Sequence, residues 1–227
     1  MSEVERTSNE TALNAVYLAE LRDHALTLVW MGYQRMLPAD YSKAEEDTIT
    51  GELARHMDEI TQDETAPLWT EHYSVKEQVR SHTSDKFGKR RPIVDIEFER
   101  HKRGKRPRLR FEAKRLGRGA TVADYCGGEG LGAFVDCHYS RTHNEVGMLG
   151  YVQTGTEHHW STKLEAELVP RVHGVIVGGE WKRVESVDGP PHTFQTIHKD
   201  KRAVNFFLLH VLLGFARLSI NDTPPGA

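Results

Sequence analysis

Residues 108–116, RLRFEAKRL, decide the fold of this chain. Apolar and charged side chains alternate along it, and a period of two is typical of a β-strand with one face in the core. Glu112 and Lys114 lie two positions apart, so a strand places both on the same face, opposite the core. An acid and a base arranged in this way indicate either a solvated strand face or a catalytic pair.

Residues 92–100, PIVDIEFER, show the same alternation. They are joined to the first stretch by HKRGKRP at 101–107, a composition typical of a turn. We therefore predict a β-hairpin with a two-residue turn at Arg103 and Gly104. The register matters because a slip of one residue would move every side chain of one strand to the other face.

The predicted register pairs acids with bases near the turn. Glu99 faces Arg108, and Glu97 faces Arg110, so each pair stabilises the hairpin by about 0.2–1 kcal/mol. These four side chains are expected to be structural.

The same register places Asp95 opposite Glu112, where two like charges repel. A divalent cation between the carboxylates would relieve that repulsion, and carboxylate oxygens suit Mg²⁺ or Mn²⁺. The Lys114 ammonium would then stabilise charge on a phosphate or orient an attacking water. Glu52, beside the apolar stripe of a predicted helix, would supply a further oxygen ligand. A strand with an ordinary polar face can carry the same pattern, and that alternative stays open.

The whole chain, residues 1–227, predicts a single mixed α/β domain. Residues 1–80 are expected to be mainly helical, and 86–218 to form the α/β core. The predicted helices are 10–37, one opened by a capping box at Ser42-x-x-Glu45 and ending near Ile60, a short one opened by Ser74-x-x-Glu77, 131–137, and one capped by Thr156 over 157–169. Further predicted strands are 145–155, 180–187, 192–198 and 204–213, the last buried in the core or in a protein interface.

The charge of the chain is unevenly distributed. Residues 86–118 hold 14 of the 30 Lys and Arg but only 4 of the 33 Asp and Glu, a net charge of +10 against −13 for the remainder. Such a strip indicates contact with a polyanion, or else a solvated charged hairpin. Its tip lacks aromatic side chains, which favours phosphate contacts over base reading. The nucleic-acid-binding candidates are Lys102, Arg103, Lys105, Arg106, Arg115 and Arg118.

Composition excludes several classes of protein. A hydrophobic content of 38% and a charged content of 28% are typical of a globular protein. The sequence has neither an apolar run of about 18 residues nor an apolar segment behind basic residues at its start, so we expect no membrane span and no signal peptide. Two cysteines make no disulfide framework, and a cytoplasmic protein is expected.

Two further motifs are weaker. Zinc binding by Cys126, Cys137, His138 and His143 is disfavoured, because structural zinc sites usually use closely spaced ligand pairs. The stretch GGEGLG at 127–132 lacks the glycine order of a dinucleotide-binding loop, and a loop beside a substrate cleft is preferred. Arg141 and His143 are minor candidates for phosphate contact.

Asp95 in RPIVDIEF and Glu112-Ala113-Lys114 in RFEAKRL resemble the signature of the PD-(D/E)XK nuclease superfamily. The resemblance implies a restriction-endonuclease-like fold, a central mixed β-sheet flanked by helices. It also implies that Asp95 and Glu112 bind Mg²⁺ or Mn²⁺, that Lys114 is the catalytic lysine, and that Glu52 is the additional acid from a helix. Val94 replaces the proline expected before the aspartate, and Glu97 is a secondary candidate for the ligand.

The stretch from 111 to 155 also resembles small prokaryotic, phage-defence-associated nuclease-like proteins, which carry E-A-K-R-L followed by a G-M-L-G-Y-V strand. In some branches a glutamine after the E-x-K strand approaches the site, which makes Gln153 a secondary candidate. The expected function is metal-dependent endonuclease activity, with DNA the favoured substrate and anti-phage defence the favoured setting. The alternative is an inactive nuclease-fold subunit that binds or assembles within a defence complex. A homo-oligomer or a subunit of such a complex is expected.

Overall fold

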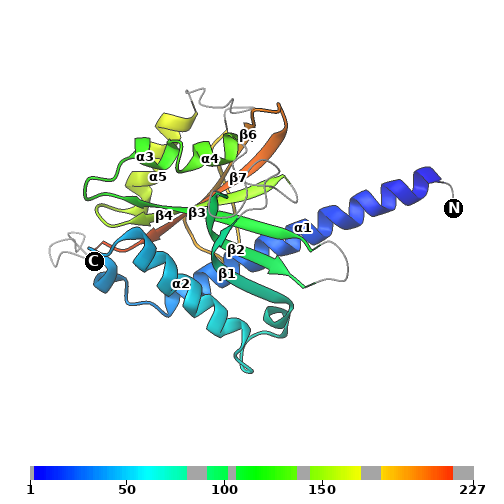
Figure 1. Ribbon diagram of the computed structural model, residues 1–227, viewed down its shortest axis with the longest axis horizontal. Helices are drawn as coiled ribbons and strands as arrows, with labels where there is room; N and C mark the ends of the chain where they lie inside the picture. Colours follow the sequence, from blue (N-terminus) through cyan, green and yellow to red (C-terminus); the bar gives the residue numbers. More distant parts are fainter. Residues whose placement is uncertain (1–2, 81–90, 102–105, 137–143, 170–179, 217–227) are drawn as a thin grey trace, which may run out of the picture.

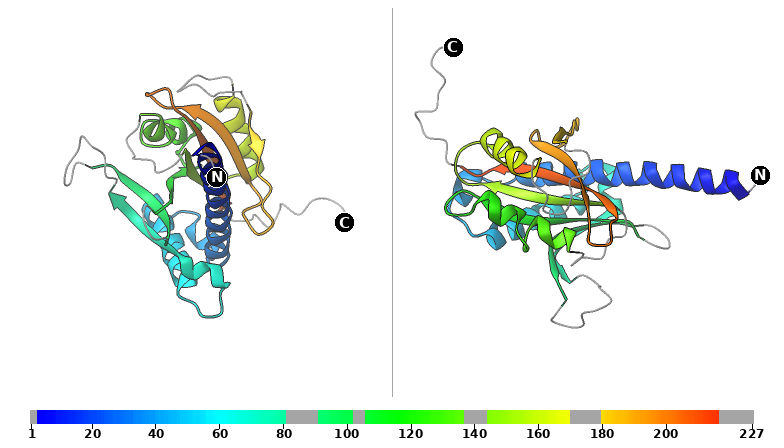
Figure 2. Two further views of the ribbon diagram at one scale, coloured as in Figure 1. Left: turned by 90° about the vertical axis from the view of Figure 1, so that its right-hand side faces the viewer. Right: turned by 90° about the horizontal axis from the view of Figure 1, so that it is seen from above.

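The computed structural model describes residues 3–80, 91–101, 106–136, 144–169 and 180–216. Figures 1 and 2 show helices on both faces of one twisted sheet. The helices are α1 (Glu3–Gln34), η1 (Pro38–Tyr41), α2 (Glu46–Thr61), η2 (Leu68–His72), α3 (Val122–Cys126), α4 (Leu131–Val135) and α5 (Glu157–Leu168). The strands are β1 (Tyr73–Arg80), β2 (Ile93–Arg100), β3 (Arg108–Leu116), β4 (Glu145–Val152), β5 (Lys182–Arg183), β6 (Thr193–Lys199) and β7 (Asn205–Gly214).

Within the described residues the sheet has seven strands in the order β1-β2-β3-β4-β7-β6-β5. The central strands β3, β4 and β7 are parallel, and antiparallel strands extend the sheet at both edges. Strands covered on both faces are apolar along nearly their whole length, as the sequences EVGMLGYV of β4 and NFFLLHVLLG of β7 illustrate. The mixed α/β class is therefore confirmed. Of the apolar run 204–213, Phe206 and residues 208–213 are buried in the core, whereas Val204, Asn205 and Phe207 are exposed.

Two apolar clusters cover the two faces of the sheet. Leucines of α1 and the α2 stripe pack with the odd-numbered residues of β3, including Phe111. Tyr125 of α3, Phe134 of α4 and Trp160 of α5 pack with Leu116 and with β4 and β7 on the other face. The alternation along β3 thus places Leu109, Phe111 and Ala113 in the first cluster and charged side chains on the other face, where only Leu116 joins the second cluster.

The predicted hairpin register is confirmed. Glu99 pairs with Arg108 and Glu97 with Arg110 across β2 and β3. The predicted turn at Arg103 and Gly104 lies outside the described residues.

Three predictions of local structure are wrong. The segment expected to open a short helix at Ser74 is β1, because Val75 pairs with Phe98 and its neighbours complete an antiparallel ladder with β2. The predicted capping box at Ser42 is absent, since Glu45 precedes α2 without a side-chain cap and the Ser42 N–H bonds back to Ala39. The strand predicted over 180–187 is reduced to β5. The Thr156 cap is confirmed, because its side chain accepts a hydrogen bond from the His159 N–H.

Candidate active site at the open end of β2 and β3

Asp95 lies where β2 separates from β3. The backbone ladder between the two strands runs to the pair of Ile96 and Phe111. Asp95 follows this pair toward the start of β2, and its Oδ2 accepts a hydrogen bond of 2.7 Å from the Ala113 N–H. The side chain therefore replaces a strand partner, because an open ladder position leaves a backbone donor that needs an acceptor. This bond holds the carboxyl group against β3.

The Glu112 side chain lies within hydrogen-bonding reach of the Asp95 carboxyl group. Two ionised carboxylates are only acceptors and repel each other, so their proximity favours the binding of a proton or a cation between them. Burial raises the pKa of Asp95, and this effect outweighs the hydrogen bonds from Ala113 and Glu112 and the charge of Lys114, which lower it. The predicted like-charge pair is therefore in place, although it is formed by side chains beyond the end of the ladder.

Lys114 extends from the same strand face as Glu112. Its Nζ lies 3.5 Å from Glu112 Oε1, and donates to Glu46 Oε1 at 2.8 Å and to the Ala113 carbonyl at 2.7 Å. Burial lowers the pKa of Lys114, but the hydrogen bond and charge of Glu46, with the charges of Glu112 and Asp95, outweigh burial and raise it. Lys114 is thus an ammonium at neutral pH and acts as a cation rather than as a proton acceptor.

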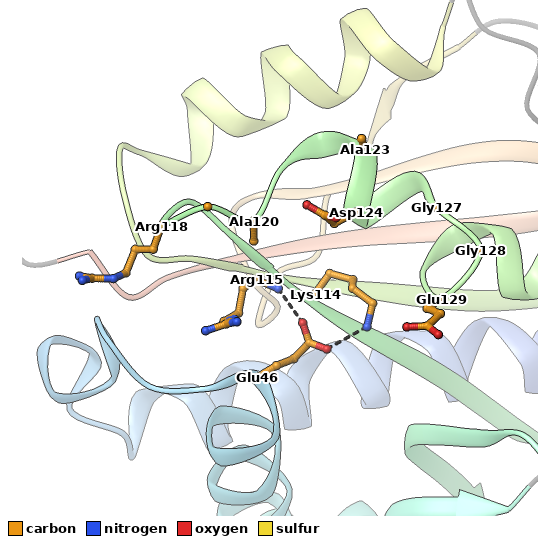
Figure 3. A pocket seen from close by; sticks show the side chains of 11 residues that line it. Glu46, Lys114, Arg115, Arg118, Ala120, Ala123, Asp124, Gly127, Gly128 and Glu129 are labelled. Atoms are coloured by element: carbon orange, nitrogen blue, oxygen red, sulfur yellow. Dashed lines mark hydrogen bonds and ion pairs between the residues drawn. The ribbon is translucent and has the colours of Figure 1, made fainter.

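The helix acid at the site is Glu46, the first residue of α2. Figure 3 shows its carboxylate between Lys114 and the backbone of Arg115, whose N–H donates to Glu46 Oε2 at 2.9 Å. Glu52, the residue predicted for this position, instead accepts hydrogen bonds from Arg55 on the surface of α2. The prediction of a helix acid is therefore moved from Glu52 to Glu46.

The helical phase explains why Glu46 is the residue that reaches β3. It lies three residues before Ile49 and seven before Leu53, both fully buried residues of the α2 stripe. Positions three and seven apart share one face of a helix, so Glu46 continues the buried stripe at the end of the helix. Glu52 follows Glu46 by six residues and is therefore offset by about 120° around the helix axis, at the edge of the stripe rather than in line with it. The spacing of Glu46 from Ile49 and Leu53 can be read from the sequence. It identifies Glu46 as the helix acid only once the helix is known to begin at Glu46.

Two residues near the acids had no signal in the sequence pattern. The buried Tyr151 hydroxyl is hydrogen-bonded to Thr50 Oγ1 at 3.0 Å. Burial and, to a smaller extent, the charges of Asp95, Glu46 and Glu77 raise the pKa of Tyr151. The Glu77 carboxyl lies against Gly51 of α2, where an added Cβ would be 3.2 Å from Glu77 Oε1. A glycine at this position allows the close approach of that acid.

The secondary candidates Glu97 and Gln153 have structural partners. Glu97 is buried and accepts a 2.7 Å hydrogen bond from Arg110 Nε. Gln153 Nε2 donates to the carbonyls of Tyr41 and Ala44 at 2.9 and 2.8 Å. These two hydrogen bonds hold the segment that precedes α2 against the end of β4. They thereby help to fix the start of α2, where Glu46 lies.

The nucleic-acid-binding candidates divide into three groups. Lys102, Arg103 and Lys105 lie outside the described residues. Arg106 is paired with Glu99 at 2.8 Å. Arg115 and Arg118 lie beside Lys114 in a cleft.

This cleft has a volume of about 560 Å³. It lies between the end of β3, the start of α2 and the α3–α4 region, as Figure 3 shows. Its lining residues are Glu46, 114–115, 118–120, 123–124 and 127–129. Glu112 lies behind Lys114 and is connected to the cleft through it. The loop predicted to flank a substrate cleft, 127–132, contributes three of its residues to the lining.

The donor set at the open end fits a hard divalent cation. Asp95 and Glu112 bring two carboxyl groups into contact, and Mg²⁺ typically takes one or two carboxylates while keeping several waters. Within the described part of the chain, no group of three or more His, Cys, Asp or Glu side chains is arranged to hold a metal ion.

Other sequence candidates contribute less. Cys137, His138, Arg141 and His143 lie outside the described residues. Burial raises the pKa of the Cys126 thiol to about 12, which disfavours the thiolate form that zinc binding needs. Over the described ranges, no helix has both the length and the apolar character needed to cross a bilayer.

Comparisons of the chain with protein-family models, with curated proteins and with solved structures gave no match. The resemblance to the PD-(D/E)XK superfamily stays a prediction.

Proposed function

We propose that this chain is a metal-dependent endonuclease of restriction-endonuclease-like fold that hydrolyses phosphodiester bonds, with DNA as the favoured substrate and anti-phage defence as its setting. One observation carries the proposal. The side chains of Asp95 and Glu112 are close neighbours, and Lys114 Nζ lies 3.5 Å from Glu112 Oε1 and lines a cleft beside Glu46.

Lys114 would place its positive charge next to the phosphate that is attacked. Its raised pKa keeps it protonated, so its contribution is to stabilise negative charge on the phosphoryl oxygens. Glu46 holds the ammonium in position through its 2.8 Å hydrogen bond. Glu46 is therefore a positioning residue in this proposal.

In the proposed hydrolysis, the water oxygen would form a bond to phosphorus as the bond to the leaving oxygen breaks. The water proton would pass to solvent, and the leaving oxygen would take a proton from solvent. Asp95 and Glu112 would hold the metal, which when bound lowers the pKa of its water and offsets phosphate charge.

The direct test is metal-dependent cleavage of plasmid DNA. We expect Lys114→Met and Glu112→Gln to lose at least about a hundredfold in rate with Mg²⁺ or Mn²⁺. Glu52→Ala is the matched control, since its carboxylate is committed to Arg55 on the surface, and it should cleave like the original chain. Equal cleavage by all three variants would exclude this site.

A second candidate function is that of an inactive binding or assembly subunit in a defence complex. The observation that favours it is the Lys114–Glu46 ion pair, which neutralises the ammonium as a structural pair would. It predicts no metal-dependent cleavage by the unmodified chain, no thermal shift with Mg²⁺ or Mn²⁺, and stable oligomers in size-exclusion chromatography.

A further inference from the structure

The cleft restricts access to the reactive side chains. The Lys114 side chain is 15% exposed and the Glu112 side chain 8%. A cleft of about 560 Å³ is within the range of roughly 300–1,000 Å³ that holds one small ligand. A duplex is far larger, because its major groove alone is about 12 Å wide. A phosphate within an intact duplex therefore cannot approach Lys114 as closely as one on a separated strand can.

The cleft lining holds three bases and three acids, and two of the acids have partners: Glu46 accepts from Lys114 and the Arg115 N–H, and Asp124 accepts from Thr121. The remaining charges differ between the two ends of the cleft. Figure 3 shows Arg115 and Arg118 at one end, Glu129 at the other, and Lys114 between them. Phosphates are attracted to the arginine end and repelled from the Glu129 end. A nucleotide has the matching polarity, with an anionic phosphate at one side and a neutral base at the other.

Arg118 is presented to the cleft by a strained turn. Gly117 and Ala120 bond to each other through both backbone groups, and Arg118 between them has a φ of +53°. A residue other than glycine in this left-handed region costs on the order of 1 kcal/mol or more. The turn packs tightly against Thr154, since a Cβ on Gly117 would lie 2.2 Å from Thr154 Oγ1. Strain held in place by packing is typical of functional positions.

Arg115 and Arg118 are both available to a phosphate. Arg115 pairs with Glu45 at 2.8 Å, but the Glu45 side chain is largely exposed to solvent, so this pair is weak and exchangeable. Within the described part of the chain, Arg118 has no ion-pair partner.

We infer that the cleft receives a single nucleic-acid strand, such as an unpaired end or a flap, rather than an intact duplex. Phosphates would lie along Lys114, Arg115 and Arg118, and the base beside the attacked phosphate would lie against Glu129. The inference rests on the proposed function, whose substrate class it specifies.

Glu129 would give the cleft a preference among bases. Its side chain is exposed, and it has no partner among the described residues. A carboxylate accepts hydrogen bonds from an exocyclic amino group, which cytosine and adenine have and thymine lacks. The cleft lining includes no aromatic side chain among the described residues, so base stacking is not expected to obscure this preference.

The test is binding of labelled oligonucleotides to the full chain, measured by fluorescence anisotropy with EDTA present so that no cleavage occurs. A single strand, the matching blunt duplex, and the same duplex with an unpaired tail are compared. We expect the strand and the tailed duplex to bind at least about tenfold more tightly than the blunt duplex, which corresponds to about 1.4 kcal/mol.

Two variants test the orientation of the strand. Arg118→Ala should reduce the slope of log affinity against log salt by about 0.7, the value for one phosphate contact on a single strand. Arg183→Ala on β5, at the far edge of the sheet, is the matched control and should leave the slope unchanged. Glu129→Gln should reduce a roughly fivefold preference for oligo-dC over oligo-dT.

The outcomes separate this inference from the proposed function. Preferential strand binding that depends on Arg118 supports the inference, even where Mg²⁺ produces no cleavage and the proposed nuclease fails. Equal or tighter binding of the blunt duplex overturns the inference, as does an unchanged salt slope in Arg118→Ala or a lack of binding. Efficient cleavage of blunt duplex by a chain without strand preference would leave the proposed nuclease standing and overturn the inference alone.

Discussion

The two ends of the β2–β3 pair use the same residue types for opposite purposes. Near the hairpin connection, Glu99 accepts hydrogen bonds from Arg106 at 2.8 Å and from Arg108 at 2.7 Å, and Lys76 lies 3.4 Å away. At the open end, Asp95 and Glu112 are close neighbours, and Lys114 lies between Glu112 at 3.5 Å and Glu46 at 2.8 Å.

The difference is visible in the direction of the pKa shifts. Burial alone would raise the pKa of Glu99, but the Arg106 hydrogen bond and the charges of Arg108 and Lys76 lower it to about 2. Burial raises the pKa of Asp95, and its neighbours do not reverse that effect. A carboxyl group surrounded by cations is fixed as an anion and contributes to stability. One that shares its site with other acids is poised to bind a proton or a metal ion.

The largest expected effect comes from breaking the buried pair at the hairpin end. Arg110→Ala leaves the Glu97 carboxylate buried without its main cation, and should lower the free energy of unfolding by about 3–5 kcal/mol. Urea denaturation measures the loss. The double variant Glu97→Leu/Arg110→Met removes both charges and should recover most of it. A loss below about 1 kcal/mol in Arg110→Ala would show that the ion pair at the hairpin end contributes no more than an exposed surface pair.

The next effect is expected at the junction of α2 with the open end. Glu46→Ala removes the acceptor of Lys114 Nζ and of the Arg115 N–H, and should cost about 1–2 kcal/mol in urea denaturation. Glu52→Ala on the same helix serves as its control and should leave the unfolding midpoint unchanged. Equal losses of unfolding free energy in both variants would show that the contacts of Glu46 with β3 do not stabilise the fold.

The third prediction concerns acid stability. Because the pKa of Glu99 is lowered to about 2, its ionised form stabilises the fold above its ordinary pKa of 4.5, and this contribution disappears as the pH falls toward 2. Glu99→Gln should therefore show a flatter loss of stability across that window. Urea midpoints measured at successive pH values give the slope, and identical slopes in both proteins would contradict the shift.

The smallest effect should have the opposite sign. Because the pKa of Asp95 is raised, its ionised form destabilises the fold, and this penalty disappears as the pH falls through the raised pKa. In EDTA at neutral pH, Asp95→Asn should stabilise the protein by about 0.2–1 kcal/mol, and the gain should shrink in acid. Thermal unfolding measures it. The same variant should lose any thermal shift produced by Mg²⁺, and a retained shift would place the ion elsewhere.

Local sequence is sufficient where the determining interactions are local. Alternation along 92–100 and 108–116, with the charge match of Glu97 to Arg110, predicts two strands and their register, and the ladder between β2 and β3 confirms both. A Ser-x-x-Glu spacing is misleading at Ser74, because a capping pattern describes only one turn of a helix. The pairing of Val75 with Phe98 across the sheet outweighs that local preference.

By itself the sequence determined the mixed α/β class, the hairpin register, and the placement of Asp95, Glu112 and Lys114 at one end of two adjacent strands, because a period of two and complementary charges operate between near neighbours. Only the tertiary structure decided that Glu46, rather than Glu52, meets Lys114. That contact joins residues 68 positions apart, and it depends on where α2 begins and how its buried stripe docks on β3. The strained turn at Arg118 and the cleft beside it are likewise products of packing, since Gly117 is held against Thr154 just beyond the end of β4.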